Sequence, residues 1–284
     1  VSGLPQGVAM VAGTYTGTYG QVVVDASGHA KYEQTSAYGH TGIGADTKND
    51  ADTVNMKVQL ADGSTATIGV KVDITDSIPT LSVDTPATGS YGNAVTGSVD
   101  LSFGADGAKS LTVKLNDGSE VTGTKGNDGN YTFNMGGGHT LTLNGTNGNF
   151  SYNGVPASGK AADYTFTFKA TDNDGDTAST STTAKIAATD LSKVTADADS
   201  TDAGVATHAT HDVTVSGLPQ GVAMVAGTYT GSFGKVTVDA SGNAKYEQTT
   251  AYRHTGIGAD TKNDADTVNV TVKRADGSTA TSGG

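Results

Sequence analysis

The chain has 284 residues, a formal net charge of −12 and no cysteine or tryptophan. This acidity disfavours nucleic acid and anionic membranes as partners, since both require basic patches, and no apolar run is long enough for membrane insertion. The lack of cysteine excludes disulfides and thiol catalysis. Forty glycines, 6% aromatic residues and 35% apolar content favour strands joined by tight turns, arranged in several small β-sandwiches with thin cores.

The first predicted elements form a hairpin. Residues 21–25 (QVVVD) and 29–34 (HAKYEQ) flank an Ala-Ser-Gly turn, and the same pattern recurs at 235–239 and 243–248. Between the two copies Val23 changes to Thr, whereas the valines on either side of it are kept. This difference is expected if residue 23 faces solvent and its neighbours face a core.

A second hairpin is predicted from residues 52–60 (DTVNMKVQL) and 68–74 (IGVKVDI), which flank an Ala-Asp-Gly-Ser turn. Its outward positions Lys57 and Gln59 become Thr and Lys in the second copy. Both hairpins are typical of antiparallel sandwich edges rather than of amphipathic helices.

The middle of the chain shows the same alternation with a different sequence. An immunoglobulin-like sandwich has about seven strands, and seven are predicted here. They cover residues 98–103, 110–115, 131–135, 140–143, 149–152, 164–170 and 179–186.

The two ends of the chain repeat each other. Residues 1–70 return as residues 215–284, with 57 of 70 positions identical. Each copy lacks a segment that the other has: the first has no counterpart of 207–214, and the second has no counterpart of 71–76. Modules of roughly 100 residues in series explain such a repeat better than a compact enzyme does.

We therefore predict an all-β chain of tandem immunoglobulin-like antiparallel β-sandwich modules in a linear array. The predicted modules are a partial module without its first strand (1–76), a complete module of a second type (77–189), and a module that repeats the first and lacks its last strand (190–284).

Three segments carry a family resemblance. Residues 18–32 (TYGQVVVDASGHAKY) resemble the TYGTLTLNADGSYTY pattern of VCBS-type repeats, and residues 163–179 (DYTFTFKATDNDGDTAS) are similar to the DTFTYTVTDADGDTAT ending of that group. Residues 103–107 (FGADG) are similar to a motif in the repeats of type I secreted giant RTX adhesins. The resemblance implies a biofilm-associated surface protein of a Gram-negative bacterium, with calcium-rigidified extender domains. At 62–64 and 276–278, Asp-Gly-Ser replaces the fuller Asp-Gly-Asp, so a complete metal site is not implied there.

The aspartates predict a calcium site independently of the resemblance. Asp172, Asp174 and Asp176 alternate around Gly175, which permits a turn sharp enough for their oxygens to converge on one hard cation. No Glu follows at the distance that an EF-hand requires, so further ligands must come from elsewhere. In a seven-strand sandwich the last hairpin lies at the same end as the module's N-terminus, which places Asp76 of the incoming linker nearby. The alternative is a polar hairpin turn that holds no ion.

The second linker also concentrates carboxylates, at Asp190, Asp197 and Asp199. A linker stapled by an ion and a mobile, solvated linker both fit this pattern. The Lys-Asn-Asp-Ala-Asp segments at 48–52 and 262–266 are weaker candidates, because Asp before a strand more often serves ordinary loop chemistry.

No group of residues predicts catalysis, and we expect a protein that is not an enzyme. His29 is Asn in the other copy, and His208 and His211 would point to opposite faces of an extended segment. His40 is expected to pack on Tyr38 rather than to bind a metal.

Three functions remain open from the sequence. The preferred one is a structural extender of a cell-surface adhesin, secreted by a type I system, whose partners are the neighbouring repeats. The second is a module that binds a glycan or a host or biofilm protein, which would require Tyr15, Tyr19, Tyr32 and Tyr38 to form an exposed platform. The third is a self-associating filament assembled by strand addition.

Overall fold

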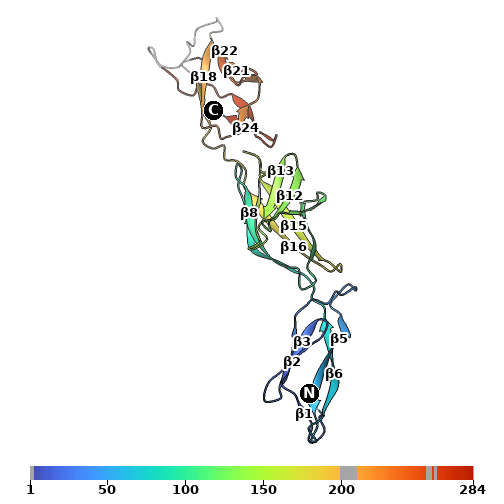
Figure 1. Cartoon of the computed structure of the whole chain (residues 1–284). Coiled ribbons are helices and arrows are strands. Elements are labelled where there is room, and N and C mark those ends of the chain that lie inside the picture. Colours follow the sequence, from blue (N-terminus) through green and yellow to red (C-terminus); the bar gives the residue numbers. More distant parts are fainter. Residues whose placement is uncertain (1–2, 199–209, 254–257, 259–260, 284) are drawn as a thin grey trace.

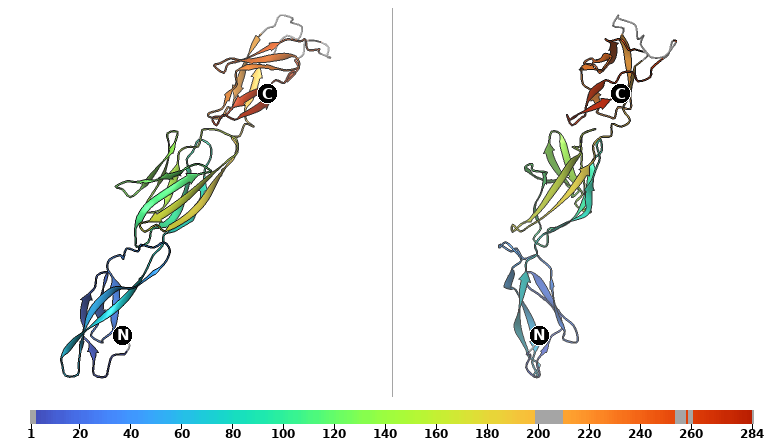
Figure 2. Two further views of the ribbon diagram at one scale, coloured as in Figure 1. Left: turned by 90° about the vertical axis from the view of Figure 1, so that its right-hand side faces the viewer. Right: turned by 180° about the vertical axis from the view of Figure 1, so that it is seen from behind.

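The computed structural model describes residues 3–198, 210–253, 258 and 261–283. Every regular element in these ranges is a strand, and every strand pair is antiparallel. Figure 1 shows the strands gathered into three bodies that follow one another along an elongated chain, and Figure 2 shows the same order from two further sides. We call them modules 1, 2 and 3. The predicted all-β class of tandem antiparallel sandwiches is confirmed.

Module 1 consists of two three-stranded sheets. One contains β1 (Ala9–Met10), β5 (Thr47–Gln59) and β6 (Thr65–Thr75), and the other contains β2 (Gly13–Thr16), β3 (Gly20–Val24) and β4 (Ala30–Gln34).

Both hairpins predicted for module 1 are present. In the β3–β4 hairpin Val22 and Val24 are buried and Val23 is only half-buried, so the substitutions between the copies identified the core face correctly. In the β5–β6 hairpin Lys57 and Gln59 are exposed, as expected.

Module 2 is a larger sandwich of two sheets. The four-stranded sheet contains β9 (Ala108–Leu115), β10 (Glu120–Thr122), β15 (Ala162–Asp172) and β16 (Thr177–Ile186). The six-stranded sheet contains β7 (Thr80–Thr88), β8 (Val95–Ser102), β11 (Thr124–Lys125), β12 (Tyr131–Gly136), β13 (His139–Leu143) and β14 (Asn149–Tyr152).

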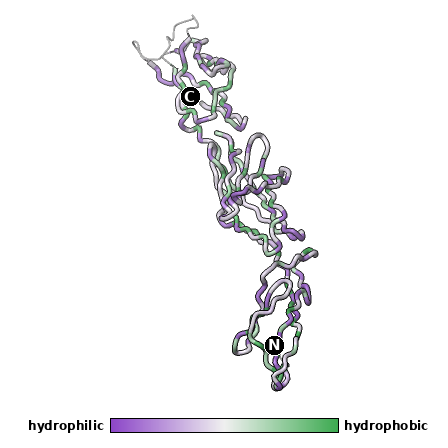
Figure 3. The backbone as a smooth tube through the Cα atoms, viewed as in Figure 1, coloured by the Kyte–Doolittle hydropathy of each residue, from purple (hydrophilic) through white to green (hydrophobic). Residues whose placement is uncertain are grey.

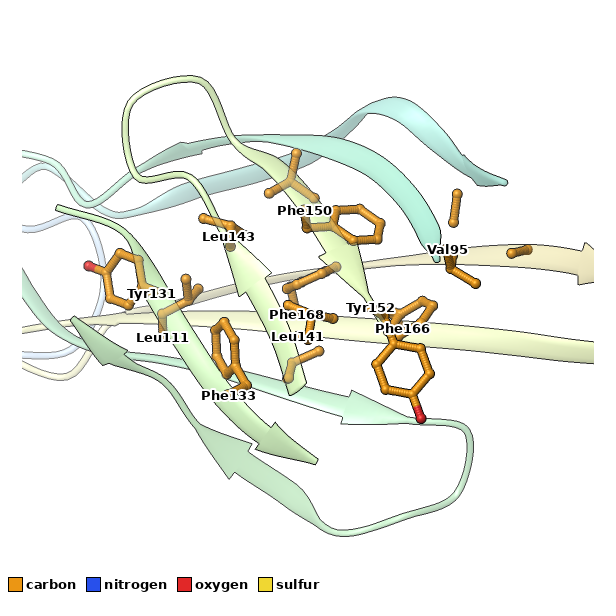
Figure 4. Close-up of a cluster of buried hydrophobic side chains, with 14 of the residues drawn as sticks. Val95, Leu111, Tyr131, Phe133, Leu141, Leu143, Phe150, Tyr152, Phe166 and Phe168 are labelled. Carbon is orange, nitrogen blue, oxygen red and sulfur yellow. The ribbon is translucent and has the colours of Figure 1, made fainter. Parts of the chain in front are cut away.

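The core of module 2 is the largest hydrophobic cluster in the described part of the chain. Phe133, Phe166 and Phe168 are fully buried, and the rings of Phe150 and Phe168 lie 5.1 Å apart. Figure 4 shows these aromatic residues between the two sheets together with Leu111 and Leu141. Modules 1 and 3 have much smaller clusters, built mainly on valines.

Strand β7 is the main element of module 2 that the sequence pattern missed. It contains Pro86, which normally argues against a strand because it cannot donate to the ladder. The pairing of β7 with β8 shifts register between Val83 and Thr85 and again between Thr85 and Thr88. The proline is accommodated at this irregularity, where a ladder hydrogen bond is not needed.

Module 3 also has two sheets and contains counterparts of all six strands of module 1, with two further strands in one sheet. One sheet contains β17 (Thr195–Ala198), β18 (Thr210–Ser216), β20 (Gly227–Thr230), β21 (Gly234–Val238) and β22 (Ala244–Gln248), and the other contains β19 (Ala223–Met224), β23 (Asn269–Lys273) and β24 (Thr279–Gly283). Strand β24 corresponds to the first five residues of β6.

Polar and apolar residues are interspersed along all three modules in Figure 3. Among the described residues, no helix is long and apolar enough to cross a lipid bilayer.

Candidate metal centre between modules 1 and 2

The turn between β15 and β16 lies at the end of module 2 that faces module 1 (Figure 1). The two strands pair up to Thr171 and Thr177, which leaves residues 172–176 as the connecting turn. Strand β9 pairs with the other side of β15 and places Ala108 opposite Asp172. The short segment before β9 therefore lies beside the same turn.

The turn is held by one carboxylate oxygen of Asp172. Its Oδ1 accepts hydrogen bonds from the backbone N–H of Gly175 at 3.0 Å and of Asp176 at 2.7 Å. Gly175 has a φ of +113°, a conformation that favours glycine. The Oδ2 atom of Asp172 is buried and has no hydrogen-bond partner in the described part of the chain.

The linker from module 1 is hydrogen-bonded both to module 1 and to the same end of module 2. The backbone N–H of Asp76 donates to the carbonyl oxygen of Asp46 at 2.8 Å, and the N–H of Ala105 donates to Oγ of Ser77 at 2.6 Å. Asp76 is only 7% exposed, and neither of its carboxylate oxygens has a hydrogen-bond partner among the described residues.

Five aspartates form one continuous group at this junction, which we call the acid cluster. Asp76, Asp106 and Asp174 offer oxygens that lie within 4.8 Å of one another, and so do Asp172, Asp174 and Asp176. Asp174 belongs to both sets. The Oδ2 atoms of Asp174 and Asp176 are also buried without a partner in the described ranges. The linker and the 172–176 turn thus direct unpaired carboxylate oxygens at one place, and Asp106 lies beside them.

Buried carboxylates in such proximity resist ionisation. Burial, followed by the carboxyl of Asp106 and the charge of Asp174, raises the pKa of Asp76 to about 6. Burial and the neighbouring Asp174 also raise the pKa of Asp172. A cation bound among these groups would remove both the mutual repulsion and the unsatisfied oxygens.

The donor set fits a hard divalent cation. All five side chains of the acid cluster offer oxygen, and Ca²⁺ takes about six to eight oxygen ligands in flexible geometry. The orphaned, buried oxygens of Asp76 and of the 172–176 turn are the observation that favours an ion over a plain polar turn.

A loop of module 1 completes the surroundings of the acid cluster. The backbone N–H of Gly44 donates to Oδ1 of Asp176 at 2.5 Å, which is a direct contact between modules 1 and 2. His40 is buried, with its Nδ1 2.8 Å from Oδ1 of Asp46, and its ring meets that of Tyr38 edge-on with centroids 4.9 Å apart. His40 therefore packs on Tyr38 as expected, but it also forms a group with Asp46 and Asp76 whose possible ligand atoms lie within 4.8 Å of one another.

The structure brings together four of the seven aspartates predicted to bind metal, namely Asp76, Asp172, Asp174 and Asp176. Asp190 is exposed and accepts a hydrogen bond from the N–H of Ser192 at 2.8 Å, as in an ordinary turn. Asp197 is exposed on β17, and neither residue joins a group of three possible ligands among the described residues. Asp199 lies outside the described residues.

Asp106 is the member of the acid cluster that the sequence analysis missed. It lies in the Phe-Gly-Ala-Asp-Gly segment at 103–107, which was noted only for its family resemblance. The available signal was topological: a strand that pairs with β15 must begin beside the β15–β16 turn, so the residues before it face that turn.

The weaker aspartate candidates have a structural explanation. Asp52 is buried, and its carboxylate accepts hydrogen bonds from the N–H of Thr18 at 2.8 Å, the N–H of Tyr19 at 3.0 Å and the hydroxyl of Tyr32 at 2.9 Å. Asp266 makes the equivalent bonds in module 3. These carboxylates are already satisfied, which agrees with loop chemistry rather than with metal binding.

The four tyrosines of module 1 do not form an exposed platform. All four are half-buried, and the rings of Tyr15 and Tyr32 pack against the valine core. Tyr19 and Tyr38 pack edge-on against each other with centroids 5.0 Å apart. These rings therefore serve packing within the module.

Comparison with known proteins identifies similar structures only. No protein-family model matches the sequence, and no curated protein matches it. The crystal structure of Drosophila N-cadherin EC1-4 aligns with 92% of this chain and 61% of its own, at 12% identity and a TM-score of 0.29. A tetra-tandem repeat in the extending region of a large adhesion protein aligns with 97% of this chain and 65% of its own, at 21% identity and a TM-score of 0.29. Protocadherin Gamma B7 extracellular cadherin domains 1–4 align with 97% and 64%, at 11% identity and a TM-score of 0.26. The chain spans less than two thirds of the length of each of these structures.

Proposed function

We propose that this chain is an extender segment of a large bacterial cell-surface adhesin. In this role, tandem sandwiches project a distal adhesive domain, and Ca²⁺ stiffens the joint between modules. The observation that carries the proposal is the acid cluster, which takes Asp76 from the linker and its other four members from module 2.

An ion at this place would act on the angle between modules. Residues 76–79 connect β6 to β7, and a connection this short still permits a hinge. A cation that binds both the linker and the 172–176 turn has its full set of ligands in one relative orientation of the modules only. Binding therefore favours that orientation. The free energy of this preference equals the difference between the binding free energy of the ion in that orientation and in the others.

The expected affinity suits an extracellular protein. Extracellular calcium modules have dissociation constants of about 10⁻⁴ to 10⁻³ M, because the ion is abundant outside the cell. Export by a type I system and a place in a biofilm belong to the same proposal, and they rest on the resemblance carried by residues 18–32, 103–107 and 163–179.

Small-angle scattering and thermal unfolding of the whole chain, with a few millimolar Ca²⁺ and then with chelator, test this function. We expect Ca²⁺ to raise the melting temperature and to lengthen and stiffen the particle, since an ion that binds the folded state must stabilise it. No change in either quantity would eliminate the calcium joint. A particle mass that grows with protein concentration would instead favour the self-associating filament.

A further inference from the structure

Modules 2 and 3 meet through direct hydrogen bonds. Ser158 of module 2 is fully buried; its Oγ accepts from the N–H of Ala275 at 2.9 Å, and its carbonyl oxygen accepts from the N–H of Asp276 at 3.0 Å. In return, Oδ2 of Asp276 accepts from the N–H of Lys160 at 2.9 Å. Three hydrogen bonds thus join a loop of module 2 to the tip of the β23–β24 hairpin.

The packing at this contact leaves no room for a larger residue. A Cβ added at Gly221 would lie 2.9 Å from Cβ of Ala157 in module 2 and 3.0 Å from Cβ of Ala275 in its own module. The 157–160 loop is also anchored from behind, since the N–H of Gly159 donates to Oγ1 of Thr189 at 2.9 Å. The loop therefore meets module 3 in a fixed shape.

Module 1 carries the same receiving surface at its far end. Ala61, Asp62 and Ser64 are the counterparts of Ala275, Asp276 and Ser278, and Gly7 is the counterpart of Gly221. A Cβ added at Gly7 would lie 3.0 Å from Cβ of Ala61, the same spacing as at Gly221.

The hairpin tips also share their internal hydrogen bonds. Oδ1 of Asp62 accepts from the N–H of Ser64 at 2.9 Å and from its hydroxyl at 2.6 Å. The corresponding distances at Asp276 are 2.8 Å and 2.6 Å. The tip of module 1 thus has the docked shape without a partner.

The occupied and unoccupied surfaces differ in what covers them. The β23–β24 tip points toward module 2, whereas the β5–β6 tip lies at the opposite end of the molecule (Figure 1). Among the described residues no acceptor is found for the N–H of Ala61 or Asp62. Leu60, which replaces Arg274, is 38% exposed and is one of three exposed large hydrophobic residues in the described ranges.

We propose that the β5–β6 tip of module 1, with Gly7, is a docking surface for a second copy of module 2. That copy would insert its Ala157–Lys160 loop there, as module 2 does against module 3. The joint uses backbone groups and one carboxylate that is already paired, so it holds without a metal ion. Leu60 would be covered by the incoming module.

Amide hydrogen exchange of the whole chain in chelator gives the first test. Asp62 and Asp276 both follow Ala and precede Gly-Ser, so they form a matched pair with the same local chemistry. We expect exchange at Asp276 to be on the order of tenfold slower than at Asp62, because only the N–H of Asp276 donates across a module joint. Equal rates would overturn the proposal.

The second test extends the chain with a further copy of residues 77–214 directly before Val1, which reproduces the natural spacing of 214 residues between the copies. Exchange at Asp62 should slow to the rate of Asp276, and Gly7→Ala should restore fast exchange at Asp62 while leaving Asp276 slow. Continued fast exchange at Asp62 in the extended chain would refute the docking surface. Both measurements use chelator, so they are independent of whether the acid cluster binds Ca²⁺.

Discussion

Replacing Asp172 by Asn separates the metal-binding role of this residue from its role in the turn. The Oδ1 atom, which accepts from the N–H groups of Gly175 and Asp176, is kept in asparagine. The Oδ2 atom, which is buried and has no partner among the described residues, becomes an NH₂ group that cannot bind a cation. The turn should therefore form normally in the Asp172→Asn variant, while the acid cluster loses one charge and one ligand.

The expected effect on stability changes sign with calcium. Two unit charges 4.8 Å apart, the upper limit within the group of Asp172, Asp174 and Asp176, repel by about 3.5 kcal/mol at an effective dielectric constant of 20. Because shared protons relieve part of this repulsion, we expect the variant to be about 1 to 3 kcal/mol more stable than the parent in chelator. At a Ca²⁺ concentration one hundred times the dissociation constant, the parent gains about 2.7 kcal/mol, and the variant loses most of that gain.

Thermal unfolding with and without Ca²⁺ measures both effects. For a domain of about 100 residues, 2.7 kcal/mol corresponds to a rise of roughly 10 to 20 °C in melting temperature. Asp128→Asn is the control, since Asp128 is an exposed turn aspartate of module 2 that accepts from the N–H of Asn130 at 3.1 Å. Equal gains from Ca²⁺ in Asp172→Asn and Asp128→Asn, or a loss of stability of Asp172→Asn in chelator, would contradict a metal-binding role for Asp172.

Three further outcomes follow from the structure. Asp52→Asn should lower the free energy of unfolding in urea by roughly 3 kcal/mol, because the new amide NH₂ would face two donors whose hydrogen bonds the carboxylate now accepts. Asp62→Asn, in an exposed turn, should lower it by under about 1 kcal/mol, and similar losses in the two variants would contradict the role of Asp52. Because the pKa of Asp76 is raised to about 6, the calcium-free junction should lose stability as the pH rises through 6, and Ca²⁺ should bind more weakly as the pH falls through 6 and Asp76 takes up a proton. Equal Ca²⁺ affinities in calorimetric titrations at pH 5 and pH 7.5 would exclude this coupling. Gly148→Ala should destabilise module 2 by about 3 kcal/mol or more, because residue 148 has a φ of +69° and the added Cβ would overlap a backbone carbonyl of β8. Gly129→Ala, where φ is +82° but the space around the Cβ is open, should destabilise it by only about 1 kcal/mol, and equal melting temperatures would show that the overlap is relieved.

Most strands could be predicted from the sequence because their buried and exposed residues alternate regularly. In the β3–β4 and β5–β6 hairpins Val23, Lys57 and Gln59 change between the copies and alternate with buried residues, which reveals the period of two. Strand β7 escaped because Pro86 masks an edge strand whose pairing is interrupted.

The members of the acid cluster that lie in one turn or next to a module boundary could be predicted, whereas the member that depends on strand pairing between distant parts of the sequence could not. Asp172, Asp174 and Asp176 lie in one turn, and the general plan of a sandwich placed Asp76 near it. Asp106 required the pairing of β9 with β15, which connects residues 51 to 64 positions apart and has no signature in composition. Asp190 and Asp197 show the converse, since a high density of aspartate in a linker did not bring their carboxylates together.

The two joints of module 2 should respond differently to removal of calcium. The joint with module 1 places unpaired carboxylates at its centre, so without an ion their repulsion favours separation. The joint with module 3 is made of hydrogen bonds at Ser158 and Asp276 that no ion completes.

Because the chain has no cysteine, pairs of spin labels can be placed at chosen sites only. Thr67→Cys with Lys185→Cys reports on the first joint, and Lys185→Cys with Thr237→Cys reports on the second. All three positions are exposed on strands. Chelation should broaden the first distance distribution and leave the second unchanged. Equal broadening would mean that the contact with module 3 depends on the ion as well, whereas two unchanged distributions would mean that hydrogen bonds such as Gly44 to Asp176 already fix the first joint without calcium.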